Sequence, residues 1–291
     1  MEPLVYIILV NYRGYIDTVD CVKSLLNIKY KNYKIIIVEN ASSDEDILKK
    51  DEFLNAHSKI LYASENKGFS DGNNIGIKYA RQFKPEYILL LNNDTVVDKN
   101  FLNELVLTAK KYDKIGLVTG KIFYYNNSKE LWYSGGTYNR DNGRTNQVLY
   151  GDLEEKEQII TFASGCLMLI SRECIDKVGL LDDNYFMYSE DTDYCCRVYD
   201  AGLKIIWTPR SVIYHKVSAS AGNNSIFQQY YITRNNFIIT KKYGNNKCRA
   251  YCTRLFQCIK DVIKGRTTIK AVVWAYMDFI RGKLGISDRF K

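Results

Sequence analysis

Apolar runs alternate with amphipathic segments along the first hundred residues. Residues 4–10 form a continuous apolar run, which predicts a strand buried on both faces, and the spacing of Val19, Val22 and Leu26 predicts a helix after it. Further strands are predicted over residues 33–38, 59–63 and 87–91, and further helices over residues 44–53 and 73–83. Four strand-then-helix units in succession favour a parallel sheet covered by helices. We therefore expect an α/β fold with a mostly parallel, Rossmann-like sheet.

The pattern changes after Gly116. Shorter β-like stretches, separated by turns rich in Gly, Asn and Asp, are found at residues 117–125, 131–138, 158–162 and 166–170. A helix is predicted over residues 190–201, and two strands over residues 204–207 and 211–215. From Ile226 onward helical spacing returns, which predicts a helical extension. We expect residues 1–225 to form the α/β domain and residues 226–291 the extension.

Length and composition are those of a globular protein, with 291 residues, 46% hydrophobic and 25% charged. No apolar run reaches the roughly 20 residues that span a bilayer, and the chain enters its first strand without a basic signal region. We expect a cytoplasmic protein. Its eight cysteines fit no disulfide framework and no C-x-x-C zinc pair, so we expect reduced core residues.

The positive charge is concentrated at the C-terminus. Residues 241–291 hold 13 Lys/Arg and 3 Asp/Glu, whereas residues 1–240 hold 28 and 30. The basic residues flank a short apolar and aromatic stretch around Trp274 and Phe279. This combination is typical of a segment that lies on an anionic membrane surface. The alternative is that the apolar side chains pack on the α/β domain; no nucleic-acid-binding motif is present, and we expect no nucleic-acid partner.

Polar side chains follow the predicted parallel strands. Asn11 follows the first strand, Glu39 the second, Lys67 the third and Asn92-Asn93-Asp94 the fourth. Ligands of open parallel sheets bind at the carboxyl ends of the strands, so these residues are candidate ligand contacts. Neither a G-x-x-x-x-G-K-[ST] loop nor a G-x-G-x-x-G turn after the first strand is present, which argues against a P-loop NTPase and a dinucleotide-dependent oxidoreductase.

An ordered set of motifs resembles glycosyltransferase family 2, and most of all its bacterial rhamnosyltransferase-like branch. The motifs are Val10-Asn11-Tyr12, Val38-Glu39-Asn40-Ala41-Ser42-Ser43-Asp44, Asn66-Lys67-Gly68-Phe69, Leu91-Asn92-Asn93-Asp94-Thr95, Ser164-Gly165-Cys166 and Tyr188-Ser189-Glu190-Asp191-Thr192-Asp193. The resemblance covers about residues 4–240. It implies the GT-A fold, a nucleotide-sugar donor, a divalent metal and inversion at the anomeric carbon.

The resemblance also implies a set of donor contacts. Asn11 and Glu39 would surround the base and ribose, with Glu39 accepting a pyrimidine N3–H and so selecting uridine or thymidine donors. Lys67 and Asn74 would lie near the donor. The alternatives are a loop or cap carboxylate for Glu39, a solvated lysine at position 67 and a first-turn helix residue at position 74.

Asn92-Asn93-Asp94 occupies the family's D-x-D position, although only its last residue is acidic. Asp94 would bind Mg²⁺ or Mn²⁺, which prefer carboxylate and phosphate oxygens, while Asn92 and Asn93 would give neutral donor contacts. His215 matches a position where related enzymes supply an imidazole to the metal or the diphosphate. The alternatives are a helix-capping role for Asp94 and a structural role for His215.

Asp191 matches the family's catalytic base, which takes the proton of the acceptor hydroxyl. The cluster from Glu190 to Asp193 lies at a predicted helix start, where the helix dipole favours ionised carboxylates. Acidic bias in the first turn of a helix is the alternative.

The resemblance therefore implies transfer of a sugar, rhamnose from dTDP-rhamnose as the best match, to a hydroxyl of a surface-glycan acceptor that is lipid-linked. The protein would lie on the inner face of the cell membrane. Other donors of the same fold, UDP-hexose or UDP-N-acetylhexosamine, stay open. A nucleotidyltransferase also stays open, although the Gly/Lys-rich first loop of such enzymes is missing here. A non-catalytic scaffold that binds a nucleotide sugar is a third alternative, and the single acid of Asn92-Asn93-Asp94 would be consistent with it.

Overall fold

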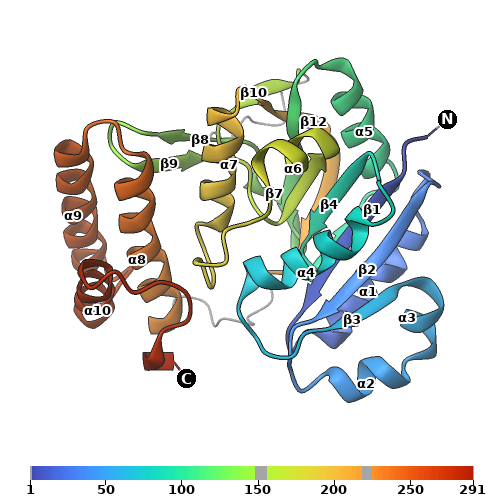
Figure 1. Ribbon diagram of the computed structural model, residues 1–291, viewed down its shortest axis with the longest axis horizontal. Helices are drawn as coiled ribbons and strands as arrows, with labels where there is room; N and C mark the ends of the chain where they lie inside the picture. Colours follow the sequence, from blue (N-terminus) through green and yellow to red (C-terminus); the bar gives the residue numbers. More distant parts are fainter. Residues whose placement is uncertain (1, 148–155, 218–224, 291) are drawn as a thin grey trace.

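A mixed ten-stranded sheet forms the centre of the molecule in the computed structural model, which describes residues 2–147, 156–217 and 225–290 (Figure 1). The order along the main path of the sheet is β10-β12-β6-β11-β4-β1-β2-β3, with β5 paired to β12 and β7 to β6. Its strands are β1 (Val5–Asn11), β2 (Tyr33–Glu39), β3 (Lys59–Tyr62), β4 (Tyr87–Leu91), β5 (Thr95–Val97), β6 (Ile115–Tyr124), β7 (Asn127–Tyr133), β10 (Gln158–Ile160), β11 (Leu167–Ser171) and β12 (Lys204–His215).

The predicted parallel half is confirmed. Strand β1 lies between β2 and β4, and all three run parallel. Because side chains alternate along a strand, β1 presents two different faces. Ile8 and Val10 contact the glycines of helix α4 (Phe69–Arg81), whereas Asn11 accepts a hydrogen bond from Thr18 of helix α1 (Tyr15–Leu26). Helices α1 and α4 therefore cover opposite faces of the sheet.

The second half of the sheet, built from the shorter predicted strands, is mixed. Strand β11 is antiparallel to both β4 and β6, while β12 runs parallel to β6. The remaining helices of the α/β part are α2 (Glu45–Lys50), α3 (Glu52–His57), α5 (Phe101–Lys111), α6 (Arg172–Val178) and α7 (Glu190–Asp200). Helix α5 packs on β6 and β12 at this side of the molecule.

Several predicted boundaries were wrong for local reasons. The helix expected over residues 44–53 is two helices, because Asp51 has an extended backbone and its side chain caps α3 through Leu54 N–H at 2.8 Å. The two strands expected over residues 204–207 and 211–215 are one strand, β12, with a register shift between Trp207 and Val212 around Pro209, which has no N–H. The strand expected over residues 131–138 is divided between β7 and β8 (Gly136–Asn139).

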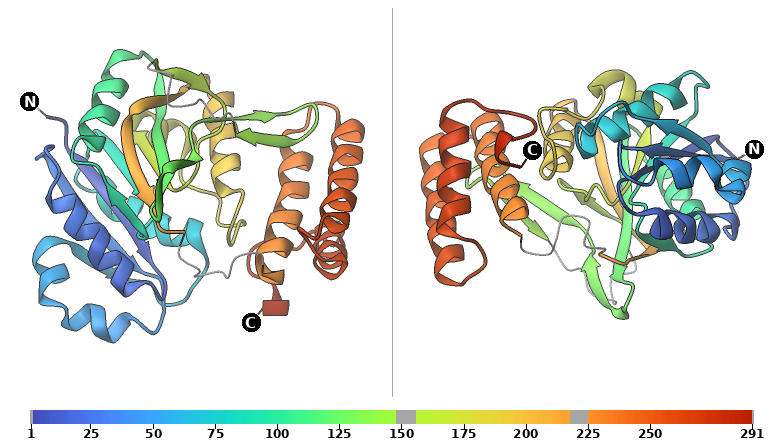
Figure 2. Two further views of the ribbon diagram at one scale, coloured as in Figure 1. Left: turned by 180° about the vertical axis from the view of Figure 1, so that it is seen from behind. Right: turned by 90° about the horizontal axis from the view of Figure 1, so that it is seen from below.

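Three C-terminal helices stand beside the sheet, as the helical spacing predicted. They are α8 (Ile226–Tyr243), α9 (Lys247–Ile263) and α10 (Ile269–Ile280), followed by a short 3₁₀ helix, η1 (Asp288–Phe290). Helix α8 contacts α7, α9 and α10, and both views in Figure 2 show α9 and α10 on the side away from the sheet. The hairpin of β8 and β9 (Arg144–Gln147) reaches across to these helices. Gly143 accepts a hydrogen bond from Arg254 of α9.

All eight cysteines are free thiols, in agreement with the reduced state predicted for them. Five are buried, Cys21, Cys166, Cys174 and Cys195 in the core of the α/β part and Cys196 in a cluster with Ile239 of α8. The core prediction was wrong for Cys248 and Cys252, which are exposed on α9. Helix α9 buries only Ala250 and Arg254, so its apolar side does not contribute to the core.

Candidate active site

The polar residues predicted from the strand ends converge on one edge of the sheet. Asn11 and Glu39 are direct register partners at the ends of β1 and β2, and Asn92-Asn93-Asp94 follows β4. Antiparallel β11 begins at this edge, because Leu167 pairs with Leu91. The segment Ser164-Gly165-Cys166 therefore enters the same edge, and Cys166 accepts a hydrogen bond from Asn92 N–H at 3.1 Å. We call this the carboxyl edge.

Asn11 and Glu39 form a buried network. The Asn11 side-chain amide donates to Glu39 Oε2 at 2.5 Å and to Asp44 Oδ2 at 3.1 Å, and Ser42 N–H donates to Glu39 Oε1 at 2.6 Å. Glu39 is completely buried. Its carboxylate therefore orders the loop from Ala41 to Asp44, and the base contact that the resemblance implied for it stays a prediction.

Asp94 faces His215 at the end of β12. Asp94 Oδ1 lies 3.1 Å from His215 Nε2, and the two segments are also joined by Lys216 N–H, which donates to the Asp94 carbonyl at 2.9 Å. The imidazole packs edge-on against Trp132. Burial opposes a charged imidazole here, but Cys166 and Asp94 outweigh it and raise the pKa of His215 to about 10.

Asp191 lies on the other side of the Ser164-Gly165-Cys166 segment. Gly165 N–H donates to Asp191 Oδ2 at 3.2 Å, and Thr192 N–H donates to Oδ1 at 2.6 Å. Burial raises the pKa of the Asp191 carboxyl, while these hydrogen bonds act to lower it. Because Cys166 interacts with His215 and Gly165 with Asp191, two consecutive residues connect the two acidic centres.

A strained turn precedes Asp191. Tyr188 and Ser189 both have left-handed backbones, with φ of 68° and 71°, and neither is glycine. Glu190 follows with a buried carboxyl, whose Oε2 has no hydrogen-bond partner. Burial raises the pKa of Glu190 to about 8, and the neighbouring Asp191 carboxylate adds to the rise.

Other residues predicted to contact the sugar donor already have partners within the protein. Asn74 is buried on α4, and its amide bonds both to the carbonyl and to the N–H of Leu181 at 2.9 and 3.0 Å. This favours the structural alternative at position 74. Lys67 lies exposed after β3 and pairs with Glu65 at 2.8 Å. Asn93 donates to Thr18 Oγ1 at 2.8 Å and so ties the β4 loop to α1.

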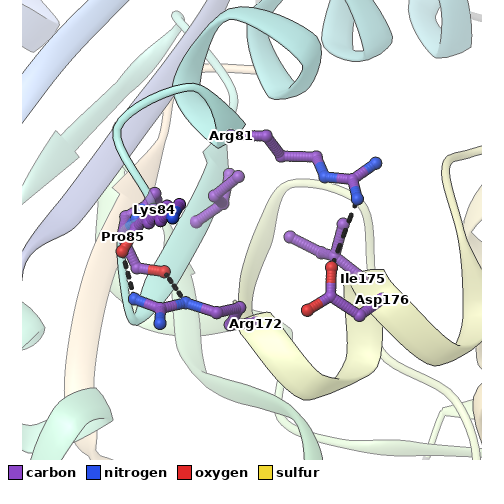
Figure 3. A pocket seen from close by; sticks show the side chains of 7 residues that line it. Arg81, Lys84, Pro85, Arg172, Ile175 and Asp176 are labelled. Carbon is purple, nitrogen blue, oxygen red and sulfur yellow. Dashed lines mark hydrogen bonds and ion pairs between the residues drawn. The ribbon is translucent and has the colours of Figure 1, made fainter.

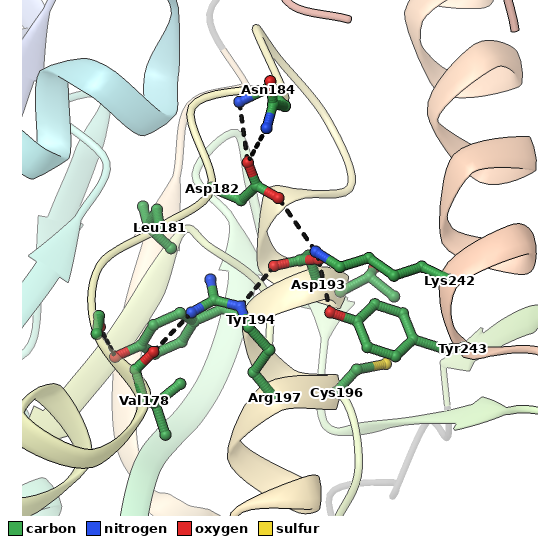
Figure 4. A network of polar contacts seen from close by, with 12 residues as sticks. Val178, Leu181, Asp182, Asn184, Asp193, Tyr194, Cys196, Arg197, Lys242 and Tyr243 are labelled. Carbon is green, nitrogen blue, oxygen red and sulfur yellow. Dashed lines mark hydrogen bonds and ion pairs between the residues drawn. The ribbon is translucent and has the colours of Figure 1, made fainter. Parts of the chain in front are cut away.

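Asp193, the last acid of the cluster, has a structural environment (Figure 4). It is completely buried, and its carboxylate accepts hydrogen bonds from Arg197, Lys242 and Tyr243 at 2.6 to 2.7 Å. Lys242 also reaches Asp182 at 3.1 Å. The cluster therefore joins α7 to α8 through Asp193, whereas Asp191 turns toward Gly165.

A cavity bordered by several charged side chains lies at the opposite edge of the sheet (Figure 3). It lies before the start of β4 and is lined in part by Arg81, Lys84 and Arg172. Two of its cations are already paired, Arg81 with Asp176 and Arg172 with Glu86, both at 3.2 Å. Its position separates it from the carboxyl edge, so it does not belong to the candidate site.

Two residues of the edge were missed by sequence reasoning. Asp44 accepts from both Asn11 and Tyr15 N–H, the latter at 3.0 Å, whereas the sequence placed it in a family motif and at a helix start without giving it a role at the site. Lys216 bonds Asp17 and Asp20 of α1 at 2.9 and 2.8 Å. Its position directly after His215 was the one available signal.

The side chains at this edge would supply only part of the ligands of a metal ion, and a bound substrate would supply others. Among residues 2–147, 156–217 and 225–290, no group of three or more His, Cys, Asp and Glu side chains is arranged to hold a metal ion. Asp94 and His215 would give two ligands: the carboxylate suits a hard divalent cation, and the imidazole would bind one only after its Nε2 has lost its proton. Diphosphate and water oxygens would have to supply the rest.

A family model and several curated relatives match this chain, and they point to the same family. The model of "Glycosyl transferase family 2" matches residues 6–179. The low-salt glycan biosynthesis hexosyltransferase Agl10 of Haloferax volcanii is 28% identical over 204 residues, 68% of this chain and 62% of the relative. The dTDP-rhamnosyl transferase RfbF of Shigella flexneri is 22% identical over 252 residues, 83% of this chain and 81% of the relative. The chain thus spans less than two thirds of the length of Agl10, and 22% of a further relative from Sinorhizobium fredii.

A solved structure supports the fold. The mannosyltransferase PcManGT from Pyrobaculum calidifontis, in complex with GDP-Man and Mn²⁺, superposes with a TM-score of 0.63 over 97% of this chain and 88% of its own, at 12% identity. The predicted α/β architecture of GT-A type is thereby confirmed. Because the family model covers more than half of the sequence, the chain belongs to glycosyl transferase family 2.

Proposed function

We propose that the chain is an inverting glycosyltransferase that uses a nucleoside-diphosphate sugar, with Asp191 as the base. The observation that carries this proposal is the convergence of the Asp94–His215 pair and Asp191 on the segment Ser164-Gly165-Cys166. Asp191 takes the proton of the acceptor hydroxyl, whose oxygen bonds to the anomeric carbon as the bond to the diphosphate oxygen breaks on the opposite face. The raised pKa of Asp191 makes it a stronger base than an exposed aspartate.

We further propose that Asp94 and His215 hold a divalent metal, Mn²⁺ or Mg²⁺, together with the donor diphosphate. When bound, the metal would neutralise charge on the leaving group. The likeness of fold to a protein whose complex contains Mn²⁺ supports this assignment. Asn92 and Asn93 lie on the same loop. The side-chain amide of Asn92 is neutral and its buried Oδ1 has no hydrogen-bond partner, so Asn92 is a candidate contact for the nucleotide sugar.

The donor we propose is dTDP-rhamnose, with UDP-sugars as the alternative. Support comes from RfbF, a dTDP-rhamnosyl transferase that aligns with 83% of this chain. Asn11 and the loop ordered by Glu39 would hold the nucleoside part, and Lys67, exposed at the carboxyl edge, would approach its phosphates. The acceptor we propose is a hydroxyl of a lipid-linked surface glycan.

Ligand-induced thermal shift tests the donor assignment, because a ligand that binds the native state raises its melting temperature. dTDP-rhamnose, UDP-glucose, UDP-N-acetylglucosamine and GDP-mannose are compared with and without Mn²⁺. We expect the largest shift with dTDP-rhamnose and Mn²⁺, and slow hydrolysis of the donor. Binding without hydrolysis or transfer would favour the non-catalytic scaffold, and a shift with GDP-mannose alone would contradict the pyrimidine donor.

The proposed membrane-binding surface consists of the exposed apolar faces of α9 and α10, the first of which is an uncovered apolar stripe on α9. Leu255, Phe256, Ile259 and Ile263 are 41 to 79% exposed, and their spacing places them within one narrow arc of the helix. Lys260 and Lys264 flank the stripe and are exposed. An amphipathic helix with a basic border is suited to the headgroup region of an anionic membrane.

Helix α10 repeats this arrangement. Ile269, Val273, Met277 and Ile280 share one face and are 39 to 68% exposed, while Ala271 and Ala275 are buried. Each basic residue near an anionic leaflet contributes about 1 kcal/mol of binding free energy. Among the described residues, none of the helices is long and apolar enough to cross a bilayer. Attachment at the surface would bring the active site to a lipid-linked acceptor.

Flotation with vesicles tests this surface. We expect the protein to float with phosphatidylglycerol vesicles and much less with phosphatidylcholine vesicles. Ile259→Glu combined with Ile263→Glu should abolish flotation. Leu107→Glu, the same kind of change at a 53% exposed site on α5, should leave it unchanged. Equal flotation with both vesicle types, or a change of oligomeric state instead of flotation in the α9 variant, would contradict the membrane assignment.

A further inference from the structure

The turn before Asp191 needs support from outside itself. Tyr188 and Ser189 adopt consecutive left-handed conformations that side-chain-bearing residues rarely adopt, and Ser189 makes no side-chain cap hydrogen bond to α7. Such a conformation persists only where surrounding contacts fix it. Asp191 is two residues beyond Ser189, so the backbone of this turn sets where its carboxylate points.

Asn235 of α8 supplies that support. Its side-chain amide nitrogen donates to the carbonyls of Met187 at 2.9 Å and Tyr188 at 2.8 Å, so both amide hydrogens are directed at successive peptide groups of the turn. Asn235 is completely buried. Two hydrogen bonds from one rigid amide fix the relative orientation of these two peptides more tightly than either bond alone.

The orientation of the Asn235 amide is itself fixed. Its Oδ1 accepts a hydrogen bond from Arg234 Nε at 3.0 Å, which determines which end of the amide faces the turn. Arg234 is buried as well, lies over the rings of Tyr230 and Tyr231, and donates to the carbonyl of Gly285 at 2.9 Å. The clamp is therefore anchored in the C-terminal helices.

We propose that Asn235 is a positioning residue, whose amide holds the Tyr188–Ser189 turn and thereby aims the Asp191 carboxylate at the acceptor site. This inference depends on the proposed role of Asp191 as base. It also gives the C-terminal helices a part in the reaction besides membrane attachment. Misplacement of a reacting group by about 1 Å can lower a rate about 100-fold.

The test compares Asn235→Ala with Asn236→Ala, the same substitution one residue further along α8, in hydrolysis of dTDP-rhamnose or of the donor that thermal shift selects. We expect Asn235→Ala to lower kcat by roughly 10- to 100-fold with an unchanged KM for the donor, and Asn236→Ala to leave both unchanged. Amide hydrogen exchange in the first turn of α7 should be faster in Asn235→Ala alone. This readout requires no substrate.

A second variant separates positioning from general loss of stability. Adding Ser189→Gly to Asn235→Ala removes the conformational cost at position 189, because glycine adopts positive φ readily. We expect it to restore part of kcat. Wild-type kcat and exchange in Asn235→Ala, or a loss of kcat that Ser189→Gly does not reduce, would overturn the proposal. If Asp191→Asn keeps full turnover, the base assignment fails instead, whatever Asn235→Ala does.

Discussion

Helices α5 and α9 have the same amphipathic pattern but opposite surroundings. Helix α5 buries six of its 11 residues against β6 and β12, including Phe101 and Leu105, which are completely buried. Helix α9 has 17 residues and buries two, while Phe256 and Ile263 are 60 and 79% exposed. One apolar face completes the core of the α/β part, and the other faces solvent.

The difference shows what periodicity establishes and what it leaves open. A helical spacing of apolar residues predicts that one face of the helix will be removed from water. It does not state whether the cover is the same chain, another protein or a lipid surface. The basic border of α9 is the additional feature that favours an anionic membrane.

The largest effect is expected at the carboxyl edge. Asp191→Asn should lower kcat by about 10²- to 10⁴-fold, because the amide cannot take the acceptor proton. Donor-induced thermal shift should persist, since Asp191 lies on the acceptor side in the proposed mechanism. Steady-state kinetics with Asp183→Asn, an exposed acid of the preceding loop, as control, measures the effect. Near-wild-type turnover of a folded Asp191→Asn protein would exclude the base role.

A pair of truncations tests the comparison of the two helices. Leu105→Ala on α5 should lower the free energy of unfolding by about 2–5 kcal/mol, because it leaves a cavity in the core. Phe256→Ala on α9 should change it by no more than about 0.5 kcal/mol and should weaken vesicle binding. Urea denaturation and flotation measure the two quantities. A large destabilisation by Phe256→Ala would mean that the α9 face is packed after all.

The junction between the two regions gives a smaller effect. Tyr243→Phe removes the 2.7 Å hydrogen bond to Asp193 and should lower the free energy of unfolding by about 1.5–3 kcal/mol. The donor KM and kcat should stay unchanged, because Asp193 acts only between α7 and α8. A loss of kcat at full stability would show instead that Asp193 belongs to the reacting groups.

A further effect depends on pH. Because the pKa of Glu190 is raised to about 8 in the folded protein, the folded state keeps a proton that the unfolded chain loses near pH 4.5. The free energy of unfolding should therefore fall as pH rises between these values. Glu190→Gln removes this dependence, so its stability relative to the wild type should increase from pH 5 to pH 8. A constant difference between the two proteins across this range would show that Glu190 is ionised in the fold.

Much of the carboxyl edge was predictable, because each residue follows a strand. The apolar runs located β1, β2 and β4, and parallel order then placed Asn11, Glu39 and Asp94 at one edge. The burial of Glu39 was not predictable, since it depends on hydrogen bonds from Asn11 and from the loop at Ser42.

Contacts between segments that are far apart in the sequence could not be predicted from the pattern of apolar and polar residues. The Asn235 amide meets the turn before Asp191 from a helix that comes after β12, and an asparagine within a helical spacing carries no sign of its partner. The division of the helix at Asp51 has a local cause instead. A single side-chain cap overrode a continuous helical pattern there.

The most direct test of the account is a crystal structure of the protein with dTDP and Mn²⁺. The account predicts the metal bound between the Asp94 carboxylate, His215 and the diphosphate at the carboxyl edge, with Asp191 on the acceptor side of the bound donor. Nucleotide bound in the cavity lined by Arg81 and Arg172, or a metal that Asp94 does not contact, would contradict it.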